Sequence, residues 1–337
     1  MKLIIPMAGK GTRLLPHTYT RAKPLIYVAG KPLLAHILDR YKRIRFEEVI
    51  FIVGEFQEDV KKFITKNYSF KATFVEQKEK KGNAHAVSLA KPYIKDTDEI
   101  GIVFADTIFD GDFSIIDKVS RNKISADGII WVREVPNPER FGVVIKEGKY
   151  ATKIVEKPST PISNEAIIGW YYFKQAKALF ESIDYIISNE IMTKNEYYLS
   201  DAIQLMINNN HKLLVEHAEF WLDCGTAETL LSTNQALLKN NSNVKSKPHN
   251  SIILKPVFIE KNVIIKNAII GPNVSIAAGA IVENAIIHNS IINDLAVIND
   301  AVLHDSIVGS KAVIKGHYTE VNIGDNSEIT YGIHKDD

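Results

Sequence analysis

A short loop near the start of the chain contains the residue types that bind phosphate. Residues 7–13 (MAGKGTR) directly follow the apolar run of residues 3–5. Glycines in such a loop let backbone N–H groups surround phosphate oxygens, and the next turn can add a cation. Two common nucleotide motifs do not fit. Leu14 replaces the third small residue of the dinucleotide fingerprint, and Gly11 stands where a Walker loop needs Ser or Thr after Lys10.

Carboxylates that could hold a metal ion occur farther along the chain. Asp106 follows the apolar run of residues 100–104, and ligands of open α/β sheets bind at the carboxyl ends of the strands. Asp110 and Asp112 are competing candidates, for which an acidic surface loop is the simpler interpretation. The 10 histidines and the one cysteine show no zinc-ligand spacing. The aspartates favour a cation that prefers oxygen ligands, such as Mg²⁺.

The elements that must position these residues alternate between strand and helix patterns. The expected strands are residues 3–5, 48–53, 72–75 and 100–104, and the expected helices are residues 33–44, 57–66 and 84–91. This alternation favours a Rossmann-like α/β domain with a mostly parallel sheet, covered on both faces. Residues 141–145 and 166–173 are expected to add strands, and residues 226–238 to form a closing helix.

The pattern changes after residues 239–250, a stretch rich in Asn, Lys and Ser that we interpret as a linker. Beyond it, large apolar residues recur at intervals of five or six, which fits neither an α-helix nor a single strand. The series is Phe258, Ile264, Ile270, Ile276, Val282, Ile287, Ile292, Ile298, Leu303, Val308 and Ile314. Such a period predicts a triangular solenoid of short parallel strands. The residues resemble the left-handed hexapeptide-repeat family, which implies a left-handed parallel β-helix.

Length and composition bound the possible functions. With 337 residues, 45% of them hydrophobic, the chain is expected to form two domains, 1–240 and 251–330. Its 41 basic and 40 acidic residues leave a formal net charge of +1, which argues against nucleic acid as a partner. The one cysteine fits a reducing compartment. No apolar stretch approaches the roughly 20 residues of a membrane span, so we expect a cytoplasmic protein without a membrane partner.

Several ordered motifs in the first domain resemble the signature of the sugar nucleotidylyltransferases. The matching elements are Gly9-x-Gly11-Thr12-Arg13-Leu14-x-Pro16-x-Thr18, Lys23-Pro24-Leu25 and Lys31-Pro32-Leu33. This family includes glucose-1-phosphate thymidylyltransferases and UDP-sugar pyrophosphorylases. Thymidylyltransferases usually have a second glycine where this chain has Ala8, and residues 6–9 are closer to bacterial UTP–glucose-1-phosphate uridylyltransferases. Residues 23–25 are closer to the thymidylyltransferases, so both dTTP and UTP stay open.

The resemblance implies an activity and a set of reacting groups. A nucleoside monophosphate would pass from a nucleoside triphosphate to a sugar 1-phosphate, with Mg²⁺ as cofactor and pyrophosphate as the second product. Arg13 would bridge the β- and γ-phosphates, and Lys23 would hold the α-phosphate. Asp106 and Asp223 would bind Mg²⁺, which needs only one or two carboxylates beside phosphates and waters. Lys10 is either a further phosphate contact or an exposed side chain, and a helix N-cap is the alternative role for Asp223.

The resemblance also implies where the base and the sugar bind. The nucleotide-binding residues would be Met7, Ala8, Gly9, Gly11, Thr12, Gln77 and Gly82. The sugar-binding residues would be Gly142, Glu156, Lys157 and Gly169, and Lys157 would in addition hold the sugar phosphate as a catalytic cation. In these roles, Gln77 offers an amide to the edge of a pyrimidine, and Glu156 accepts hydrogen bonds from sugar hydroxyls.

Three alternatives compete with this interpretation. A non-catalytic subunit of the same fold would tend to lose the cations and carboxylates that this chain keeps. The β-helix could act as an acetyltransferase through His288, His304 or His317, although exposed histidines are the simpler interpretation. The acceptor could be another phosphorylated molecule, such as phosphocholine. An exposed solenoid also favours self-association, so a homo-oligomer is expected.

Overall fold

The structure is a computed structural model that describes residues 1–316 and 321–330 of the chain. Its contacts divide into two units. Met1–Gly9 and Ile37–Trp221 form one, here called the sheet unit, and Lys10–His36 and Leu222–Asp337 form the other, the solenoid unit. The predicted domains, 1–240 and 251–330, follow the order of the chain. The contacts instead group Lys10–His36 with the C-terminal part.

A nine-stranded sheet forms the centre of the sheet unit, in the order β5-β4-β1-β6-β11-β8-β12-β10-β9. The strands are β1 (Lys2–Pro6), β4 (Glu48–Val53), β5 (Lys71–Glu76), β6 (Ile100–Val103), β8 (Gly128–Glu134), β9 (Gly142–Glu147), β10 (Tyr150–Glu156), β11 (Glu165–Phe173) and β12 (Leu213–His217). The first four strands in this order pair in parallel, whereas β11 runs antiparallel to both of its main neighbours, β6 and β8. The predicted α/β fold is confirmed, and the second half of its sheet is mixed.

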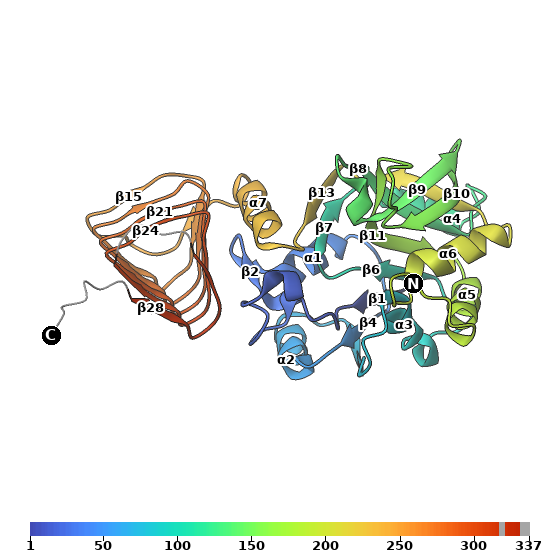
Figure 1. The fold of residues 1–337 in the computed structure, drawn as a ribbon, viewed down its shortest axis with the longest axis horizontal. Helices are drawn as coiled ribbons and strands as arrows, with labels where there is room; N and C mark the ends of the chain where they lie inside the picture. Colours follow the sequence, from blue (N-terminus) through green and yellow to red (C-terminus); the bar gives the residue numbers. More distant parts are fainter. Residues whose placement is uncertain (317–320, 331–337) are drawn as a thin grey trace. The chain divides into compact units, whose positions relative to one another are not determined.

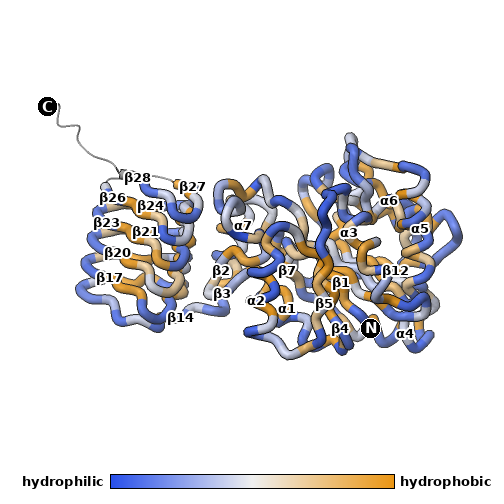
Figure 2. Tube along the Cα trace, turned by 90° about the horizontal axis from the view of Figure 1, so that it is seen from below, coloured by the Kyte–Doolittle hydropathy of each residue, from blue (hydrophilic) through white to orange (hydrophobic). Residues whose placement is uncertain are grey.

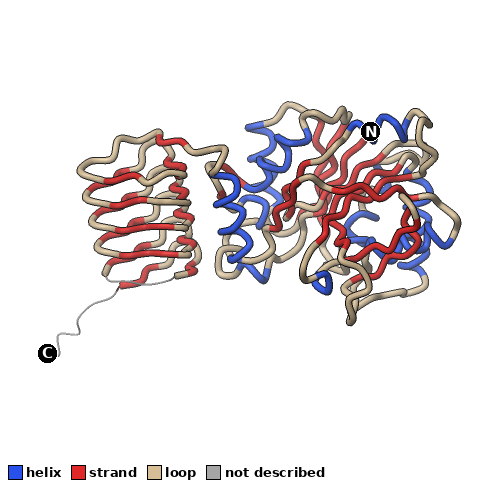
Figure 3. Tube along the Cα trace, turned by 90° about the horizontal axis from the view of Figure 1, so that it is seen from above, coloured by secondary structure: helices blue, strands red, loops and turns tan. Residues whose placement is uncertain are grey.

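Helices flank these strands, as Figure 3 shows. They are α2 (Gln57–Asn67), α3 (Asn83–Ser88), α4 (Ser114–Ser120), α5 (Ala176–Ser188) and α6 (Leu199–Asn208), and α1 (Leu33–Tyr41) precedes them. Every residue of β4 is buried, which is the pattern expected of a parallel strand that is covered on both faces. Apolar residues of α3, α5 and α6 pack against β1, β4, β6 and β11 in one buried cluster. None of the helices in the described residues is both long and apolar enough to span a bilayer.

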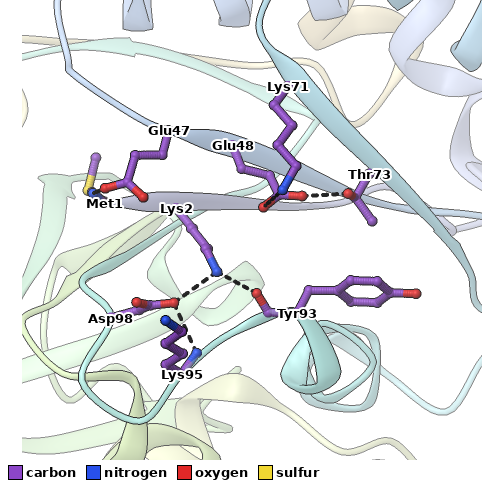
Figure 4. A network of polar contacts seen from close by, with 9 residues as sticks. All are labelled: Met1, Lys2, Glu47, Glu48, Lys71, Thr73, Tyr93, Lys95 and Asp98. Carbon is purple, nitrogen blue, oxygen red and sulfur yellow. Dashed lines mark hydrogen bonds and ion pairs between the residues drawn. The ribbon is translucent and has the colours of Figure 1, made fainter.

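Charged side chains at the amino-terminal ends of the parallel strands are paired with one another (Figure 4). Lys2 on β1 lies 2.9 Å from Asp98, and Glu48 on β4 accepts hydrogen bonds from Lys71 at 3.0 Å and from Thr73 at 2.5 Å on β5. This edge of the sheet is therefore occupied by structural ion pairs. The opposite, carboxyl ends of the strands carry the loops with the predicted functional residues, as expected for an open α/β sheet.

The N-terminal part of the solenoid unit consists of short elements and a helix. These are η1 (Thr12–Leu14), η2 (Lys23–Leu25), β2 (Tyr27–Val28), β3 (Lys31–Pro32) and α7 (Ala227–Leu238). A capping box formed by Thr226 and Thr229 begins α7, which confirms the expected closing helix. Asn234 on α7 accepts a hydrogen bond from the backbone N–H of Ala29 at 2.9 Å, and this contact fastens the β2–β3 turn to the helix.

Three parallel sheets of six, four and five strands form the left-handed β-helix, whose triangular coils are visible in Figure 1. The first sheet contains β14 (Asn243–Val244), β16 (Val257–Ile259), β19 (Val274–Ile276), β22 (Ile291–Ile292), β25 (Ile307–Val308) and β27 (Asn322–Ile323). The second contains β15 (Ile252–Ile253), β18 (Ile269–Ile270), β21 (Ile286–His288) and β24 (Val302–His304). The third contains β17 (Ile264–Lys266), β20 (Ile281–Glu283), β23 (Val297–Asn299), β26 (Val313–Lys315) and β28 (Glu328–Thr330).

Asparagine and aspartate residues form the corners of the coils. Asn267, Asn284 and Asp300 have φ angles of 49°, 50° and 55°, a conformation that these short polar side chains tolerate better than most. Their side chains also form a ladder, because Asn267 donates to Asn284 at 3.1 Å and Asn284 donates to Asp300 at 3.0 Å. The corner residues therefore both turn the chain and connect successive coils.

The apolar repeat from Phe258 to Ile314 should mark the side chains that point into the β-helix. This holds from Ile270 onward and is wrong in the first coil. Ile259 and Ile265 belong to the buried core of the β-helix, whereas Ile264 is 46% exposed and Phe258 lies on the outer side of its sheet, against Gly30. Neighbouring strand residues point to opposite faces, and in this coil both neighbours are apolar, so a six-residue count cannot choose between them. Figure 2 shows the apolar strands of the β-helix alternating with hydrophilic corners.

The interpretation of residues 239–250 as a linker, which rested on their composition, is also partly wrong. It contains β14, which pairs in parallel with β16 and begins the first sheet of the solenoid.

Candidate active site

The phosphate-loop signature folds into a turn that depends on glycine. Gly11 has a φ of 63°, and a Cβ placed there would lie 2.9 Å from Thr18 Cγ2 and 3.3 Å from Lys23 Cβ. The hydroxyl of Thr18 donates to the carbonyl of Gly11 at 3.0 Å. Leu14, which breaks the dinucleotide fingerprint, is a core residue with 1% exposure. The turn brings Lys23 beside Gly11 and leaves Thr12 on its exposed side.

Arg13 and Asp223 meet over Gly225. A Cβ on this glycine would lie 3.1 Å from Nη2 of Arg13 and 3.0 Å from Oδ1 of Asp223. The backbone N–H of Gly225 donates to the same carboxylate oxygen at 3.0 Å, which orients the carboxylate. The N-cap of α7 is Thr226, so a capping role does not account for Asp223. The solenoid unit thus brings together one predicted cation and one predicted metal ligand.

The residues that end β1 lie at the edge of the sheet unit. The backbone N–H of Met7 donates to the carbonyl of Ile52 at 2.8 Å, and Ala8 is buried at 4% exposure. Gly9 is exposed, and none of the described atoms would lie within 4 Å of a Cβ added to it. The packing of the protein itself therefore does not explain a glycine at this position. Lys10, the ambiguous lysine of the loop, is exposed.

Gln77 is buried, and the protein fixes the orientation of its amide. Nε2 of Gln77 donates to the carbonyl of Gly82 at 3.2 Å and lies 3.0 Å from Nδ1 of His85. A carbonyl oxygen only accepts hydrogen bonds, so the amide nitrogen must face Gly82, and Oε1 points elsewhere. Burial lowers the pKa of His85, which favours the neutral ring that can accept a hydrogen bond at Nδ1. His85 belongs to no motif in the sequence, so only the structure connects it with Gln77.

Gly82 itself is required by a close approach of the backbone. Its φ is 108°, and a Cβ there would lie 2.4 Å from the carbonyl oxygen of Tyr197. The backbone N–H of Ala84, at the start of α3, donates to the same carbonyl at 3.0 Å. The segment around Tyr197 thus holds the loop that carries Gln77 and Gly82.

Gly142 and Glu156 are cross-strand partners at the end of the β9–β10 pair. A Cβ on Gly142 would lie 2.9 Å from Oε2 of Glu156, so the glycine leaves room for this carboxylate. Ser200 donates to the same oxygen at 2.9 Å. Burial raises the pKa of Glu156 above its usual value, although the hydrogen bond from Ser200 and the charge of Lys157 act in the opposite direction.

Lys157 follows Glu156 in an unusual backbone conformation, with a φ of 44°. Its Nζ donates to the hydroxyl of Tyr198 at 3.0 Å and lies 3.6 Å from Oε1 of Glu156. Burial alone would lower the pKa of Lys157, but the hydrogen bond to Tyr198 and the charge of Glu156 outweigh it and raise the pKa. Lys157 therefore stays protonated at neutral pH. Tyr198 and Ser200 were missed in the sequence because no motif there connects the start of α6 with residues 41 and 44 positions earlier.

Gly169 interrupts β11 at a bulge and shapes the chain before Asp106. Its φ is 80°, and a Cβ there would lie 2.8 Å from the ring of Phe104. The backbone N–H of Phe104 donates to the carbonyl of Gly169 at 2.9 Å. Asp106 comes two residues later, between β6 and β7 (Thr107–Asp110). Gly169 thus acts by letting the backbone that leads to Asp106 pack closely.

The two competing aspartates have structural partners. Asp110 forms ion pairs with Arg40 at 3.2 Å and with Arg43 at 2.6 Å. Asp112 accepts a hydrogen bond from the backbone N–H of Ser114 at 2.9 Å, at the start of α4. These partners explain both residues without a metal, and Asp106 remains the predicted ligand from this segment.

The described part of the chain contains no group of three or more His, Cys, Asp or Glu side chains arranged to hold a metal ion. A fully protein-bound metal is therefore not built into these residues. The predicted donor set, Asp106 and Asp223, supplies two hard carboxylates and leaves the other positions to phosphates and waters, which is how Mg²⁺ is commonly held. The donor chemistry fits this ion.

Two histidines of the described coils, His288 and His304, lie on the outer surface of the β-helix. His288 and His304 stack on adjacent strands of the second sheet, with ring centroids 5.6 Å apart. His304 also contacts Asp305 at 3.2 Å. His317 lies outside the described residues.

Comparison with known proteins places these features in a family. The family model described as nucleotidyl transferase matches residues 2–240. The chain belongs to the nucleotidyl transferase family. This nucleotidyl transferase is 34% identical over 267 residues to the bifunctional protein GlmU of Methanocaldococcus jannaschii, with 78% of this chain and 61% of that protein covered. The chain thus spans about three fifths of the length of this relative.

A second relative is matched almost throughout. The nucleotidyl transferase is 30% identical over 242 residues to the UTP–glucose-1-phosphate uridylyltransferase AglF of Haloferax volcanii, with 70% of this chain and 96% of that protein covered. A solved structure assigned to a glucose-1-phosphate thymidylyltransferase from Bacillus anthracis superposes with a TM-score of 0.61 at 25% identity, over 70% of this chain and 95% of that one. A UDP-glucose pyrophosphorylase structure, with a TM-score of 0.60 and 21% identity, shares the fold.

Proposed function

We propose that this nucleotidyl transferase moves a nucleoside monophosphate from a nucleoside triphosphate, dTTP or UTP by preference, to a sugar 1-phosphate. The products are a nucleoside diphosphate sugar and pyrophosphate, and Mg²⁺ is the cofactor. The proposal is supported most directly by Arg13, which belongs to the loop signature of the family, and by Asp223, which the fold holds near Arg13 over Gly225. The names of AglF and of the Bacillus anthracis protein, both of which concern glucose 1-phosphate, support the acceptor class.

The chemistry needs cations more than a base. The attacking phosphate oxygen is already ionised at neutral pH, so the barrier comes from repulsion between two anions and from charge on the departing pyrophosphate. In the proposal, Arg13 neutralises the leaving pyrophosphate and Lys23 the α-phosphate. Asp106 and Asp223 would hold Mg²⁺, which supplies further charge neutralisation on the triphosphate when bound. The backbone at the exposed Gly9 and the half-buried Gly11 would lie against phosphate oxygens.

In the proposal, Lys157 binds the phosphate group of the acceptor sugar. This lysine keeps its positive charge through its contacts with Tyr198 and Glu156. Glu156 would bind sugar hydroxyls, and Gly142 leaves space next to its carboxylate. A fixed cation and a fixed carboxyl, adjacent in sequence, suit an acceptor that carries both a phosphate and hydroxyl groups. The names of AglF and of the Bacillus anthracis protein favour a sugar phosphate over phosphocholine.

The orientation of Gln77 supports a uracil or thymine base. Because Nε2 is bound to Gly82 and His85, Oε1 is the amide atom that remains for a ligand, and it can only accept. Uracil and thymine present an N3–H donor at their hydrogen-bonding edge, whereas N3 of cytosine is an acceptor. The amide oxygen therefore suits N3–H of uracil or thymine without distinguishing UTP from dTTP, and the N4 amino group of cytosine is a second donor that the assay with CTP tests.

A pyrophosphate-release assay tests the proposal. The purified chain is incubated with each of ATP, CTP, GTP, UTP and dTTP, paired with glucose 1-phosphate, N-acetylglucosamine 1-phosphate or phosphocholine, with Mg²⁺ or with EDTA. We expect release with UTP or dTTP and a sugar 1-phosphate, and none with EDTA. Release with phosphocholine alone would replace the acceptor class, and no release with any pair would favour the non-catalytic alternative.

The proposal also covers the compartment and the oligomeric state of the protein. The single cysteine supports a reducing compartment such as the cytoplasm, and the exposed faces of the solenoid support a homo-oligomer. Size-exclusion chromatography with light scattering measures the oligomeric state directly.

A further inference from the structure

One corner of the β-helix carries polar side chains on three successive coils. Asp294, Ser310 and Asp325 follow β22, β25 and β27 in the first sheet. Ser310 Oγ donates to Asp294 Oδ1 at 2.6 Å, and the backbone N–H of Ser310 donates to Asp325 Oδ1 at 2.8 Å. Burial would raise the pKa of Asp294, but the hydrogen bond from Ser310 and the charge of Arg21 outweigh it and hold the pKa below its usual value. The corner is therefore a preformed anionic surface.

Arg21 binds across this corner. Its Nη2 donates to Ser310 Oγ at 2.7 Å and to Asp294 Oδ1 at 3.2 Å, and its Nε lies 3.8 Å from Asp325 Oδ2. A planar guanidinium can reach several acceptors at once, which a lysine cannot do in the same geometry. A single side chain thus contacts three coils of the solenoid.

The residues before Arg21 are attached to the same coils. Thr20 donates to Asp325 Oδ2 at 2.6 Å, and the ring of His17 forms a hydrogen bond with Asn322. A Cβ on Gly324 would lie 3.0 Å from Cβ of Pro16, so the glycine allows the two backbones to approach closely. Residues 16–21, here called the docking segment, are therefore held along their length by the last coils of the β-helix.

The docking segment lies between the two predicted phosphate cations in the sequence, with Arg13 before it and Lys23 after it. Gly11, Thr18 and Lys23 also pack together, so a shift of the segment would move Lys23 relative to the loop. The buried core of the β-helix is complete without these polar contacts. The loop itself is held by short backbone turns, in which Leu14 N–H donates to Gly11 and Ile26 N–H to Lys23, and its irregular middle also contacts the coils through the docking segment.

We infer that the last coils of the β-helix position the phosphate loop, with Arg21 and Asp294 as positioning residues for the triphosphate. The inference rests on the proposed function, because it assigns the positioned cations to a nucleoside triphosphate. It gives the solenoid a direct part in nucleotide binding. Loss of the Arg21 contacts should weaken triphosphate binding and leave the sugar-phosphate residues, which belong to the sheet unit, unaffected.

The test compares Arg21→Ala, Asp294→Asn and their double variant with Asp300→Asn. Asp300 is a matched control, because it is also a corner aspartate but accepts from Asn284 rather than from the docking segment. We expect KM for the triphosphate to rise roughly 5- to 10-fold in Arg21→Ala and roughly 3-fold in Asp294→Asn. The double variant should be no worse than Arg21→Ala, since both remove one network. KM for the sugar phosphate should stay within about 2-fold, as should all constants of Asp300→Asn.

Hydrogen exchange of a peptide that covers residues 15–26 gives a second readout that does not depend on activity. Exchange should quicken in Arg21→Ala and Asp294→Asn and stay unchanged in Asp300→Asn. Arg21→Lys should recover part of the protection. Equal triphosphate KM and equal exchange in Arg21→Ala and Asp300→Asn would overturn the inference. If the wild-type chain releases no pyrophosphate with any pair, the proposed function fails, and the exchange data alone decide whether the coils hold the loop.

Discussion

The residues proposed to bind the sugar phosphate and those proposed to bind the triphosphate are held by different kinds of scaffold. Glu156 ends β10 of the nine-stranded sheet, Lys157 follows it directly, and both contact the start of α6, so regular structure holds them. Arg13 and Lys23 lie in an irregular loop with two short 3₁₀ turns. That loop shares its unit with the β-helix and is bound to it through the docking segment. Irregular backbone holds a side chain accurately only if another surface supports it.

The largest expected effect concerns the loop. Arg13→Ala should lower kcat/KM roughly 10²- to 10³-fold, because the charge on the departing pyrophosphate loses its main side-chain donor. Lys10→Ala is the matched control, since Lys10 is exposed in the same loop. Steady-state kinetics with both substrates measure the loss. Equal activity of the two variants would show that the loop does not contribute its cation as proposed, and the contrast between the two scaffolds would lose its functional meaning.

The stability of the β-helix core can be tested by removing one of its buried side chains. Ile287→Ala should destabilise the protein by about 2–4 kcal/mol, because Ile287 is fully buried in the β-helix core. Its neighbour Ile286 is 43% exposed, so Ile286→Ala should change stability by less than about 0.5 kcal/mol. Chemical denaturation of both variants measures the difference. Similar losses in the two would contradict the register of this coil.

The proposed metal ligands, Asp106 and Asp223, can be distinguished by mutation from neighbouring aspartates. Asp223→Asn should raise the Mg²⁺ concentration for half-maximal activity roughly 10- to 100-fold, because a neutral amide is a much weaker ligand for Mg²⁺. Asp106→Asn should behave similarly. Asp112→Asn, which keeps an acceptor for the backbone N–H of Ser114, should change it less than about 2-fold. A large effect of Asp112→Asn would move the metal site away from Asp106.

In the sheet unit, the hydrogen bond between Lys157 and Tyr198 can be tested separately. Tyr198→Phe removes the hydroxyl that accepts from Lys157 Nζ, so KM for the sugar phosphate should rise roughly 3- to 10-fold while KM for the triphosphate stays nearly constant. The pKa of Lys157 should fall in this variant, and activity should decline at a lower pH on the alkaline side. Tyr185→Phe is the control, since Tyr185 is 52% exposed on α5. Parallel changes in both KM values would contradict a separate role for the two scaffolds.

The smallest expected effect is on stability as a function of pH. Burial lowers the pKa of His17 in the docking segment, although Asn322 and Asp325 act in the opposite direction. The unfolded chain, with the ordinary histidine pKa of 6.5, therefore takes up a proton before the folded chain does as pH falls. Folding stability should decrease as pH falls through this value. His17→Asn should show a shallower decrease between about pH 7.5 and pH 5.5, by less than about 1 kcal/mol. Equal slopes in urea unfolding would contradict this assignment.

Much of the fold could be predicted from the sequence where one periodicity dominates. Residues 48–53 were expected as a strand and are β4, and residues 226–238 were expected as a helix and are α7 with its cap. The β-helix was predicted from its repeat, because inward aliphatic residues must recur once per face. Its first coil was misread where Ile264 and Ile265 are both apolar, since only packing decides which of two adjacent side chains points inward.

The candidate site could be predicted only as a list of residues. Motifs selected Gln77 and Lys157, but not His85, Tyr198 and Ser200, which orient them or their neighbour Glu156. These partners carry no motif of their own, because a hydrogen bond needs only one suitable atom at the right place. The roles of the predicted residues stay predictions until the substrates are tested.

The sequence by itself determined the family, the alternation of strands and helices, and the apolar repeat of the solenoid. It also determined which charged residues are available for phosphate chemistry. Tertiary structure alone decided that Arg13 lies beside Asp223 and that Arg21 binds three coils of the solenoid. The physical reason is that periodicity and spacing act over a few residues, whereas these contacts join positions hundreds of residues apart. Such contacts exist only after the backbone has folded and brought the groups within hydrogen-bond distance.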